Sequence, residues 1–123
     1  MHDPLPDWLR EAVEPALADL QLPTPIDLRV AWDAREQMLS VIEPDRVTSY
    51  TPLLREPASE LLVDLAGWLQ EQVFPESEGA WGEARPACPG HAHMADPEVL
   101  DGAAWWICPV DGRRIGRIGT LAG

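Results

Sequence analysis

The only two cysteines of the chain begin two short turns of similar sequence near its C-terminal end. The first turn is Cys88-Pro89-Gly90-His91, the second is Cys108-Pro109-Val110-Asp111-Gly112, and sixteen residues separate them. Each turn therefore places a second residue that can bind a metal three positions after its cysteine. Pairs of ligands at this spacing, about 15 to 20 residues apart, are typical of four-coordinate zinc sites. The pattern predicts a metal centre built from two loops, which constrains the fold of the C-terminal third.

These two turns resemble the knuckles of zinc ribbons and of rubredoxin-type metal sites, in which the sequence is Cys-Pro-x-Cys-Gly. The resemblance lies in Cys88-Pro89 and in Cys108-Pro109-x-x-Gly112, covers about a quarter of the chain and identifies no family for the whole sequence. His91 and Asp111 stand where each knuckle would have its second cysteine. The resemblance implies one zinc ion held by short antiparallel strands.

The sequence leaves the fourth ligand of this site open. Cys88, His91 and Cys108 are three candidate ligands, and either His93 or Asp111 completes the set. In an extended segment, residues two apart face the same side, so His91 and His93 can reach one ion. Asp111 instead occupies the expected position in its knuckle. A third alternative is that one of these two only holds a ligand by a hydrogen bond.

Two alternatives to a metal site are a pair of buried free thiols and a redox or disulfide pair. We favour a single structural Zn²⁺, because residues 85–123 contain few large aliphatic side chains and a metal cross-link would stabilise them.

A catalytic zinc needs an open coordination position and a general base nearby. Glu83, Asp96 and Glu98 are available as bases, but no spacing singles one out, and no H-E-x-x-H, zinc-deaminase or G-x-S-x-G motif is present.

The composition is that of an acidic globular chain of 123 residues with 46% hydrophobic residues, enough for one domain with a core. Residues 1–84 contain 17 acidic and 5 basic residues, whereas residues 85–123 contain 4 of each. Because an acidic surface repels phosphate groups, we expect no nucleic-acid partner. A basic protein partner fits this charge better, and so does the alternative that the charge serves only solubility.

The apolar stretches are far shorter than the roughly 18 residues of a membrane span, and the N-terminus has no signal-peptide pattern. We therefore expect a cytoplasmic protein with no membrane partner, in which cysteines are thiols or metal ligands. All nine basic residues are Arg, and Lys and Asn are absent, as expected of a GC-rich bacterial genome.

Apolar periodicity predicts two amphipathic helices, over residues 4–20 and 57–74. Asp3 is expected to cap the first helix, and Pro15 to kink it or divide it in two. Residues 75–87 are expected to form a linker or extended loop. Alternating patterns and turn residues predict strands over 26–32, 37–43, 46–51, 103–107 and 115–121.

This order of elements predicts an α+β fold: a helix, an antiparallel hairpin or three-stranded sheet, a second helix, and a zinc-ribbon-like set of short antiparallel strands. We expect residues 1–84 to form an acidic body and residues 85–123 a ribbon-like segment packed on it as one compact domain.

Three functions are compatible with these features. The first is a small zinc-binding protein that acts through protein–protein contacts, as an adaptor, a regulator or an immunity-type protein. The second follows from a resemblance, in charge and element order, to type III secretion chaperones, which implies an acidic dimer that binds client segments. The third is a zinc-dependent hydrolase, which requires a cleft and an open position at the metal.

Overall fold

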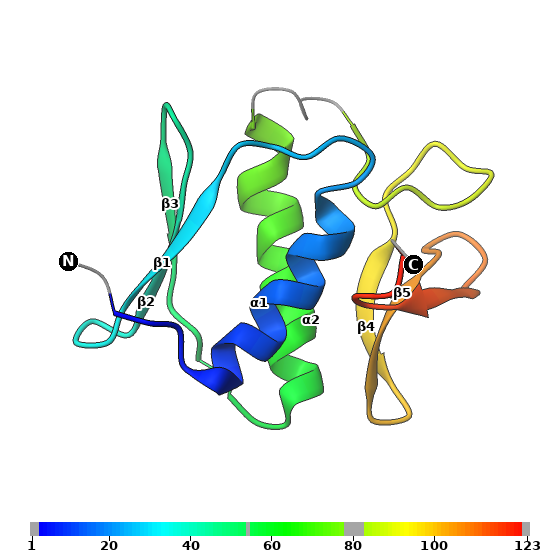
Figure 1. Ribbon diagram of the computed structural model, residues 1–123. Coiled ribbons are helices and arrows are strands. Elements are labelled where there is room, and N and C mark those ends of the chain that lie inside the picture. Colours follow the sequence, from blue (N-terminus) through cyan, green and yellow to red (C-terminus); the bar gives the residue numbers. More distant parts are fainter. Residues whose placement is uncertain (1–2, 54, 78–82, 122–123) are drawn as a thin grey trace.

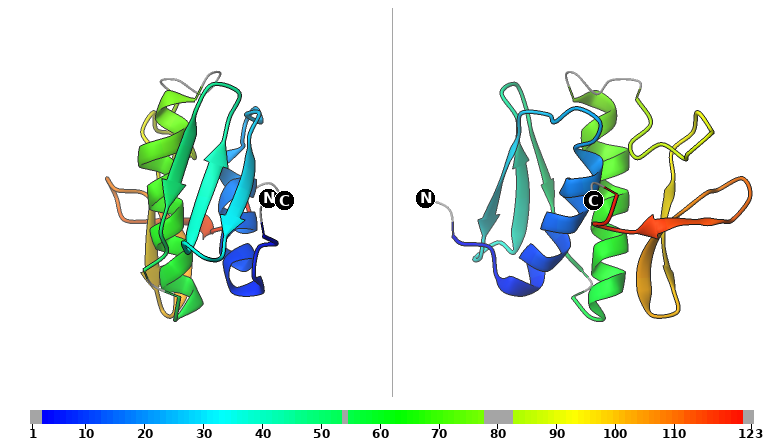
Figure 2. Two further views of the ribbon diagram at one scale, coloured as in Figure 1. Left: turned by 90° about the vertical axis from the view of Figure 1, so that its left-hand side faces the viewer. Right: turned by 45° about the vertical axis from the view of Figure 1, so that its right-hand side comes forward.

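The computed structural model describes residues 3–53, 55–77 and 83–121. Two three-stranded antiparallel sheets lie on opposite sides of a pair of helices (Figure 1). The same three layers are seen from another direction in the right-hand view of Figure 2. The predicted α+β fold and its order of elements are confirmed.

The middle layer consists of helix α1 (Asp7–Leu20) packed against helix α2 (Ala58–Trp68). Helix α2 continues as a π-helical turn, η1 (Leu69–Val73), and a 3-10 turn, η2 (Phe74–Glu76). Because sheets cover both sides of this layer, the helices bury apolar side chains on more than one face.

The first sheet contains β1 (Arg29–Asp33), β2 (Met38–Ile42) and β3 (Val47–Tyr50), with β2 in the centre. Trp32 pairs with Leu39 across the first hairpin, and both are buried. The alternation of the sequence therefore points one face of this sheet at the helices.

The second sheet contains β4 (Asp96–Leu100), β5 (Ala103–Ile107) and β6 (Arg114–Arg117), with β5 in the centre. Strand β4 lies against α2. Asp101 and Gly102 both have positive φ angles, of 53° and 75°, as required by the two-residue turn that joins β4 to β5.

A single cluster of buried side chains connects the three layers. It joins α1 and α2 with Trp32, Leu39 and Val41 of the first sheet and with Ala104 and Trp106 of the second. The C-terminal segment adds few large side chains to this cluster. Besides Ala104 and Trp106, it contributes Cys88, Ala95, Cys108 and Ile118. The division into an acidic body over residues 1–84 and a ribbon-like segment over residues 85–123 stays a prediction.

The start of the first helix differs from the prediction. Helix α1 begins at Asp7, after Pro6, and Asp3 does not cap it. The backbone N–H of Asp3 donates to the Trp32 carbonyl at 3.0 Å, and its carboxylate accepts from the N–H of Ala34 at 2.9 Å. Two prolines at positions 4 and 6 explain the shift, because a residue that precedes proline avoids the helical conformation.

Pro15 does not divide the helix into two, since α1 is one helix of 14 residues. A proline inside a helix costs about 3 kcal/mol. Buried residues on both sides of it, such as Ala12 and Leu20, hold the helix in the core and offset this cost. Pro15 also lies against Gly119, where an added Cβ would be 2.6 Å from the Pro15 Cβ atom.

Two strands differ by several residues from the prediction: β1 begins at Arg29 and not at residue 26, and β6 ends at Arg117 and not at residue 121. Strand β1 begins at Arg29 because the backbone of Ile26 bonds to the side chain of Gln21 instead of to a strand. Strand β6 ends at Arg117, because the chain turns at Gly119, whose φ angle is 102°.

The predicted linker over residues 75–87 is partly buried. Ser77 and Arg85 are buried at its two ends, while its middle, residues 78–82, lies outside the described residues. The Arg85 guanidinium donates to the carbonyl of Leu20 at 3.0 Å and pairs with Glu83 at 3.0 Å. Its positive charge thus lies at the C-terminal end of α1, where the helix dipole favours a cation.

Asp19 connects α1 to the C-terminal segment. Its carboxylate is fully buried and accepts three hydrogen bonds: from Trp106 Nε1 at 2.7 Å, from the Gly119 N–H at 2.6 Å and from the Leu121 N–H at 3.1 Å. A buried carboxylate needs such donors, because it has lost its water. These bonds fix both β5 and the segment after β6 to the helix layer.

Replacing Asp19 with Ala should lower the free energy of unfolding by about 3 kcal/mol, because the buried indole N–H of Trp106 and two partly buried backbone N–H groups lose their acceptor. The measurement is urea denaturation of the wild type and the variant. The control is Asp27→Ala, a change of an exposed carboxylate, which should cost less than about 0.5 kcal/mol. Equal losses in the two variants would contradict the anchoring role of Asp19.

Candidate metal centre

The first cysteine turn lies at the tip of a narrow loop over residues 86–95. The loop is closed at its base by the Ala95 N–H, which donates to the Pro86 carbonyl at 2.9 Å, and further along by the Cys88 N–H, which donates to the His93 carbonyl at 3.0 Å. At the tip, the His91 N–H donates to the Cys88 carbonyl at 3.0 Å. This backbone pairing turns the side chains of Cys88, His91 and His93 toward the same region.

A buried amide from the helix layer holds the base of this loop. Gln70 of η1 donates through Nε2 to the Arg85 carbonyl at 3.0 Å and to the Ala95 carbonyl at 2.7 Å. Gln70 is 4% exposed, so both bonds are shielded from water. The sequence did not indicate this role, because a Gln beside the apolar stripe of a helix carries no signal of its partner.

The second cysteine turn joins β5 to β6. The Gly112 N–H donates to the Cys108 carbonyl and the Cys108 N–H donates to the Arg113 carbonyl, both at 2.9 Å. Gly112 has a φ of 75°, which a residue with a side chain rarely adopts. This tight turn keeps the Cys108 side chain next to the first loop.

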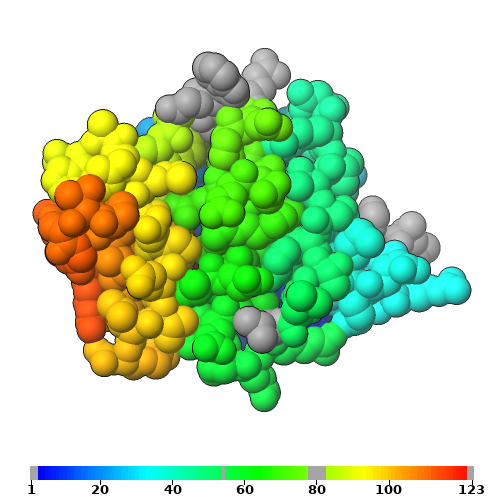
Figure 3. Space-filling view, turned by 180° about the vertical axis from the view of Figure 1, so that it is seen from behind, coloured from blue at the N-terminus to red at the C-terminus, as the bar shows by residue number. Residues whose placement is uncertain are grey.

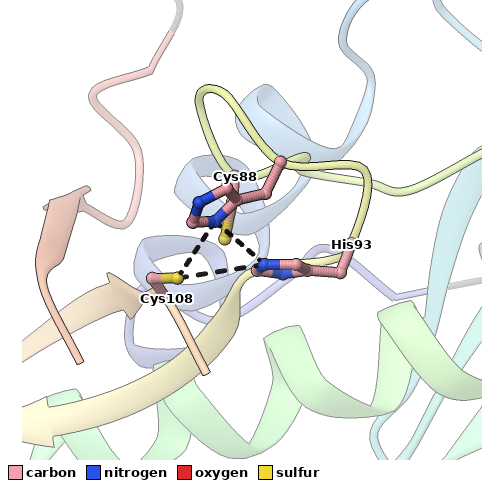
Figure 4. Close-up of side chains that lie close together, drawn as sticks. Cys88, His93 and Cys108 are labelled. Atoms are coloured by element: carbon pink, nitrogen blue, oxygen red, sulfur yellow. Dashed lines mark hydrogen bonds between the residues drawn. The ribbon is translucent and has the colours of Figure 1, made fainter. Parts of the chain in front are cut away.

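The two loops bring four side chains together in a Cys2His2 cluster (Cys88, His91, His93, Cys108), part of which is shown in Figure 4. One ligand atom from each residue lies within 4.8 Å of all the others. Cys108 Sγ is 3.5 Å from His91 Nδ1 and 4.0 Å from His93 Nε2, and the two ring nitrogens are 3.0 Å apart. A tetrahedral zinc ion with bonds of about 2.0 to 2.3 Å keeps its ligand atoms about 3.3 to 3.8 Å apart. The distances in the cluster lie on both sides of this range, so the four atoms could hold a small metal ion after small movements of the side chains.

The cluster lies at the edge of the core, with its sulfurs inside and its rings outside. Cys88 and Cys108 are buried, His93 is half-buried and His91 is exposed. His93 Nδ1 lies 3.3 Å from the Met94 carbonyl. A proton on Nδ1 can be donated to this carbonyl, which leaves the Nε2 lone pair free for a metal.

Burial and the neighbouring Cys108 thiol raise the pKa of Cys88 to about 11, from an ordinary value of 9.0. The thiol is thus protonated at neutral pH in the absence of a cation. A metal ion binds the thiolate, so metal binding at this cluster must release a proton.

Asp111, the alternative fourth ligand, is not part of the cluster. Its carboxylate is exposed and accepts a hydrogen bond from the Arg113 N–H at 3.0 Å. That bond is the first cause of its lowered pKa, and the neighbouring Cys108 is the second. Asp111 thus lies in the turn beside the cluster, whereas His93 lies within the cluster.

The three carboxylates considered as general bases also lie outside the cluster. Glu83 pairs with Arg85, and Asp96 and Glu98 are on β4, exposed on a different surface. Among the described residues, the group of four contains no carboxylate. Its donor set is two sulfurs and two imidazole nitrogens.

No protein-family model matches the chain, and no curated protein or solved structure is significantly similar to it. In the parts of the chain that the structure describes, no helix combines the length and the apolar character needed to cross a membrane.

The raised pKa of Cys88 predicts how the stability of the zinc-free protein depends on pH. A thiol whose pKa is higher in the folded than in the unfolded chain stabilises the fold below pH 9.0, and this contribution is lost as the pH rises toward about 11. The free energy of unfolding, measured with urea, should therefore fall between these two values. The Cys88→Ala variant should show a smaller fall.

Both proteins are best compared in a Tyr50→Phe background. Burial and a hydrogen bond to Asp64 raise the pKa of Tyr50, which would add a loss of stability of the same sign at high pH. Identical pH profiles with and without Cys88 would contradict the buried, protonated thiol.

Proposed function

We propose that the chain binds one Zn²⁺ ion through Cys88, His91, His93 and Cys108, and that the ion has a structural role. The convergence of four ligand atoms from two loops within 4.8 Å is the observation that carries this proposal. Strands β4 and β5 separate the two loops in the chain, and each loop is held in place by its own backbone hydrogen bonds.

The donor set favours zinc over other abundant ions. Thiolate and imidazole are preferred ligands of zinc, whereas magnesium and calcium prefer oxygen. Two thiolates and two neutral imidazoles also balance the charge of a divalent ion, so the buried sulfurs would carry no net charge into the core. Asp111 would lie beside the site and would not bind the ion.

The role that fits this position is a cross-link. The ion, when bound, joins the loop over residues 86–95 to the turn between β5 and β6. Four protein ligands fill the positions of a tetrahedral ion, which is the arrangement of structural zinc and not of catalytic zinc. The cross-link would stabilise a segment whose buried side chains are mostly small.

The biological activity that we propose is protein–protein contact, as in an adaptor, a regulator or an immunity-type protein. The acidic surface of residues 1–84 supports a basic protein partner over nucleic acid or an anionic membrane. The location that we propose is the cytoplasm, where reduced cysteines can bind zinc.

Elemental analysis of two single variants tests this proposal. Wild-type protein purified without added metal should contain about one zinc per chain. His93→Ala should lose the zinc or bind it at least about tenfold more weakly, because it removes a ligand. Asp111→Ala is the matched control: it removes the neighbouring carboxylate and should retain the zinc.

Each other outcome has a definite meaning. Zinc retained in both variants would indicate three protein ligands and a bound water, the arrangement of a zinc hydrolase. Loss in Asp111→Ala alone would show that Asp111 is the fourth ligand. Wild-type protein without zinc, together with unchanged stability of Cys88→Ser, would contradict the proposal as a whole.

A further inference from the structure

An open groove runs along α2 on the face of the molecule seen in Figure 3, where α2 lies at the surface between the two sheets. Helix α2 and the π-helical turn η1 form its floor. Its walls come from β3 on one side and from Met94 and β4 on the other. Both β3 and β4 are edge strands of their sheets, so the groove is bordered by two strand edges.

A pair of aromatic side chains lies in this groove. The rings of Tyr50 and Trp68 are 5.0 Å apart and tilted by 35°, and both residues are half-buried. Their exposed ring surface can therefore contact a ligand. The faces of aromatic rings attract cations, and they attract the guanidinium of arginine in particular.

Carboxylates surround the aromatic pair. Asp64, Glu71, Asp96 and Glu98 line the groove and are all exposed. Asp64 accepts a hydrogen bond from the Tyr50 hydroxyl. Among the ion pairs of the described residues, none includes any of these four, and no basic residue lines the groove. The groove thus combines negative charge and aromatic surface with no cation of the chain itself.

Elsewhere in the chain, a tryptophan ring with a carboxylate beside it already binds an arginine of the chain itself. The Arg114 guanidinium lies 4.9 Å from the centre of the Trp105 ring and 2.6 Å from an oxygen of Asp101. Arg55 also lies over a ring, that of Trp8, at 4.3 Å, where its side-chain partner is Gln37 and not a carboxylate. Trp68 has similar surroundings, an aromatic face with carboxylates beside it, but no arginine among the described residues lies over it.

We infer that this groove binds an arginine side chain of a partner protein, presented on an extended segment. The guanidinium would lie on Trp68 and pair with Glu71 and Glu98, as Arg114 lies on Trp105 and pairs with Asp101. An extended segment suits a groove with a strand edge on each side, because such edges can pair with a further strand. Arginine fits better than lysine, since its planar group both stacks on a ring and forms paired hydrogen bonds with carboxylates.

This inference rests on the proposed function, since it names the surface and the chemistry of the proposed basic partner. The two are also connected in the structure, because Met94 of the groove belongs to the loop that would bind zinc and Asp96 directly follows that loop.

The test is a peptide titration in which binding is monitored by nuclear magnetic resonance. Zinc content is measured first, so that failure of the metal site is recognised separately. The probe is the peptide acetyl-GRGRG-amide, and the signal is the indole N–H of Trp68. We expect the chemical shift of this signal to change as peptide is added, until the groove is saturated. The change should be much smaller with the same peptide carrying neutral citrulline in place of arginine. Raising the salt concentration should weaken the binding.

Two double variants separate the groove from the overall negative charge. Glu71→Gln with Glu98→Gln should weaken binding about fivefold, because two carboxylate partners are lost. Glu14→Gln with Glu36→Gln changes the net charge equally at exposed sites outside the groove and should weaken it less than about twofold.

Three results would overturn the inference. They are no shift of Trp68 in zinc-containing protein, an equal shift with the citrulline peptide, and equal weakening in the two double variants. The last would show that the peptide responds only to the net charge of the chain.

Discussion

The second sheet depends on how the chain after residue 85 is fixed to the helices, because this segment contributes few large apolar side chains to the core. Trp106 is its largest buried apolar side chain, and most others are small. Polar anchors compensate for this. Asp19 holds β5 and the segment after β6, Gln70 holds the loop over residues 86–95, and a metal at the Cys2His2 cluster would join the two turns. A segment of this kind is stable only when each such buried polar group is satisfied.

The cluster and the groove are parts of one arrangement. The loop that carries His91 and His93 also contains Met94 and continues directly into β4, and Met94 and β4 form one wall of the groove. A metal ion that fixes the loop would therefore also fix this wall. On our proposals, zinc prepares a surface for a partner and takes no part in a reaction, and the acidic charge of the chain is used locally, beside Trp68.

The sequence predicted most of the elements, because apolar periodicity decides them directly. Residues 103–107 form β5 as predicted, and within it Trp105 is half-buried whereas Trp106 lies in the core. Strand β4 was not predicted individually, although Asp101-Gly102 was a signal for its hairpin. Spacing in the sequence limited the candidate metal ligands to five residues. Which of His93 and Asp111 joins the cluster depends on the geometry of the loops, which spacing does not reveal. Asp19 and Gln70 bond partners at least 15 residues away, which no local pattern reveals.

X-ray absorption at the zinc edge, on protein purified without added metal, tests the central claim most directly. Our proposal predicts an average shell of two sulfurs at about 2.3 Å and two nitrogens at about 2.0 to 2.1 Å, with imidazole scattering beyond them. A shell with one sulfur or none, or one with an oxygen ligand in place of the second imidazole, would contradict the Cys2His2 site. Absence of zinc would contradict it entirely, and the anchoring of the C-terminal segment would then depend on Asp19 and Gln70 alone.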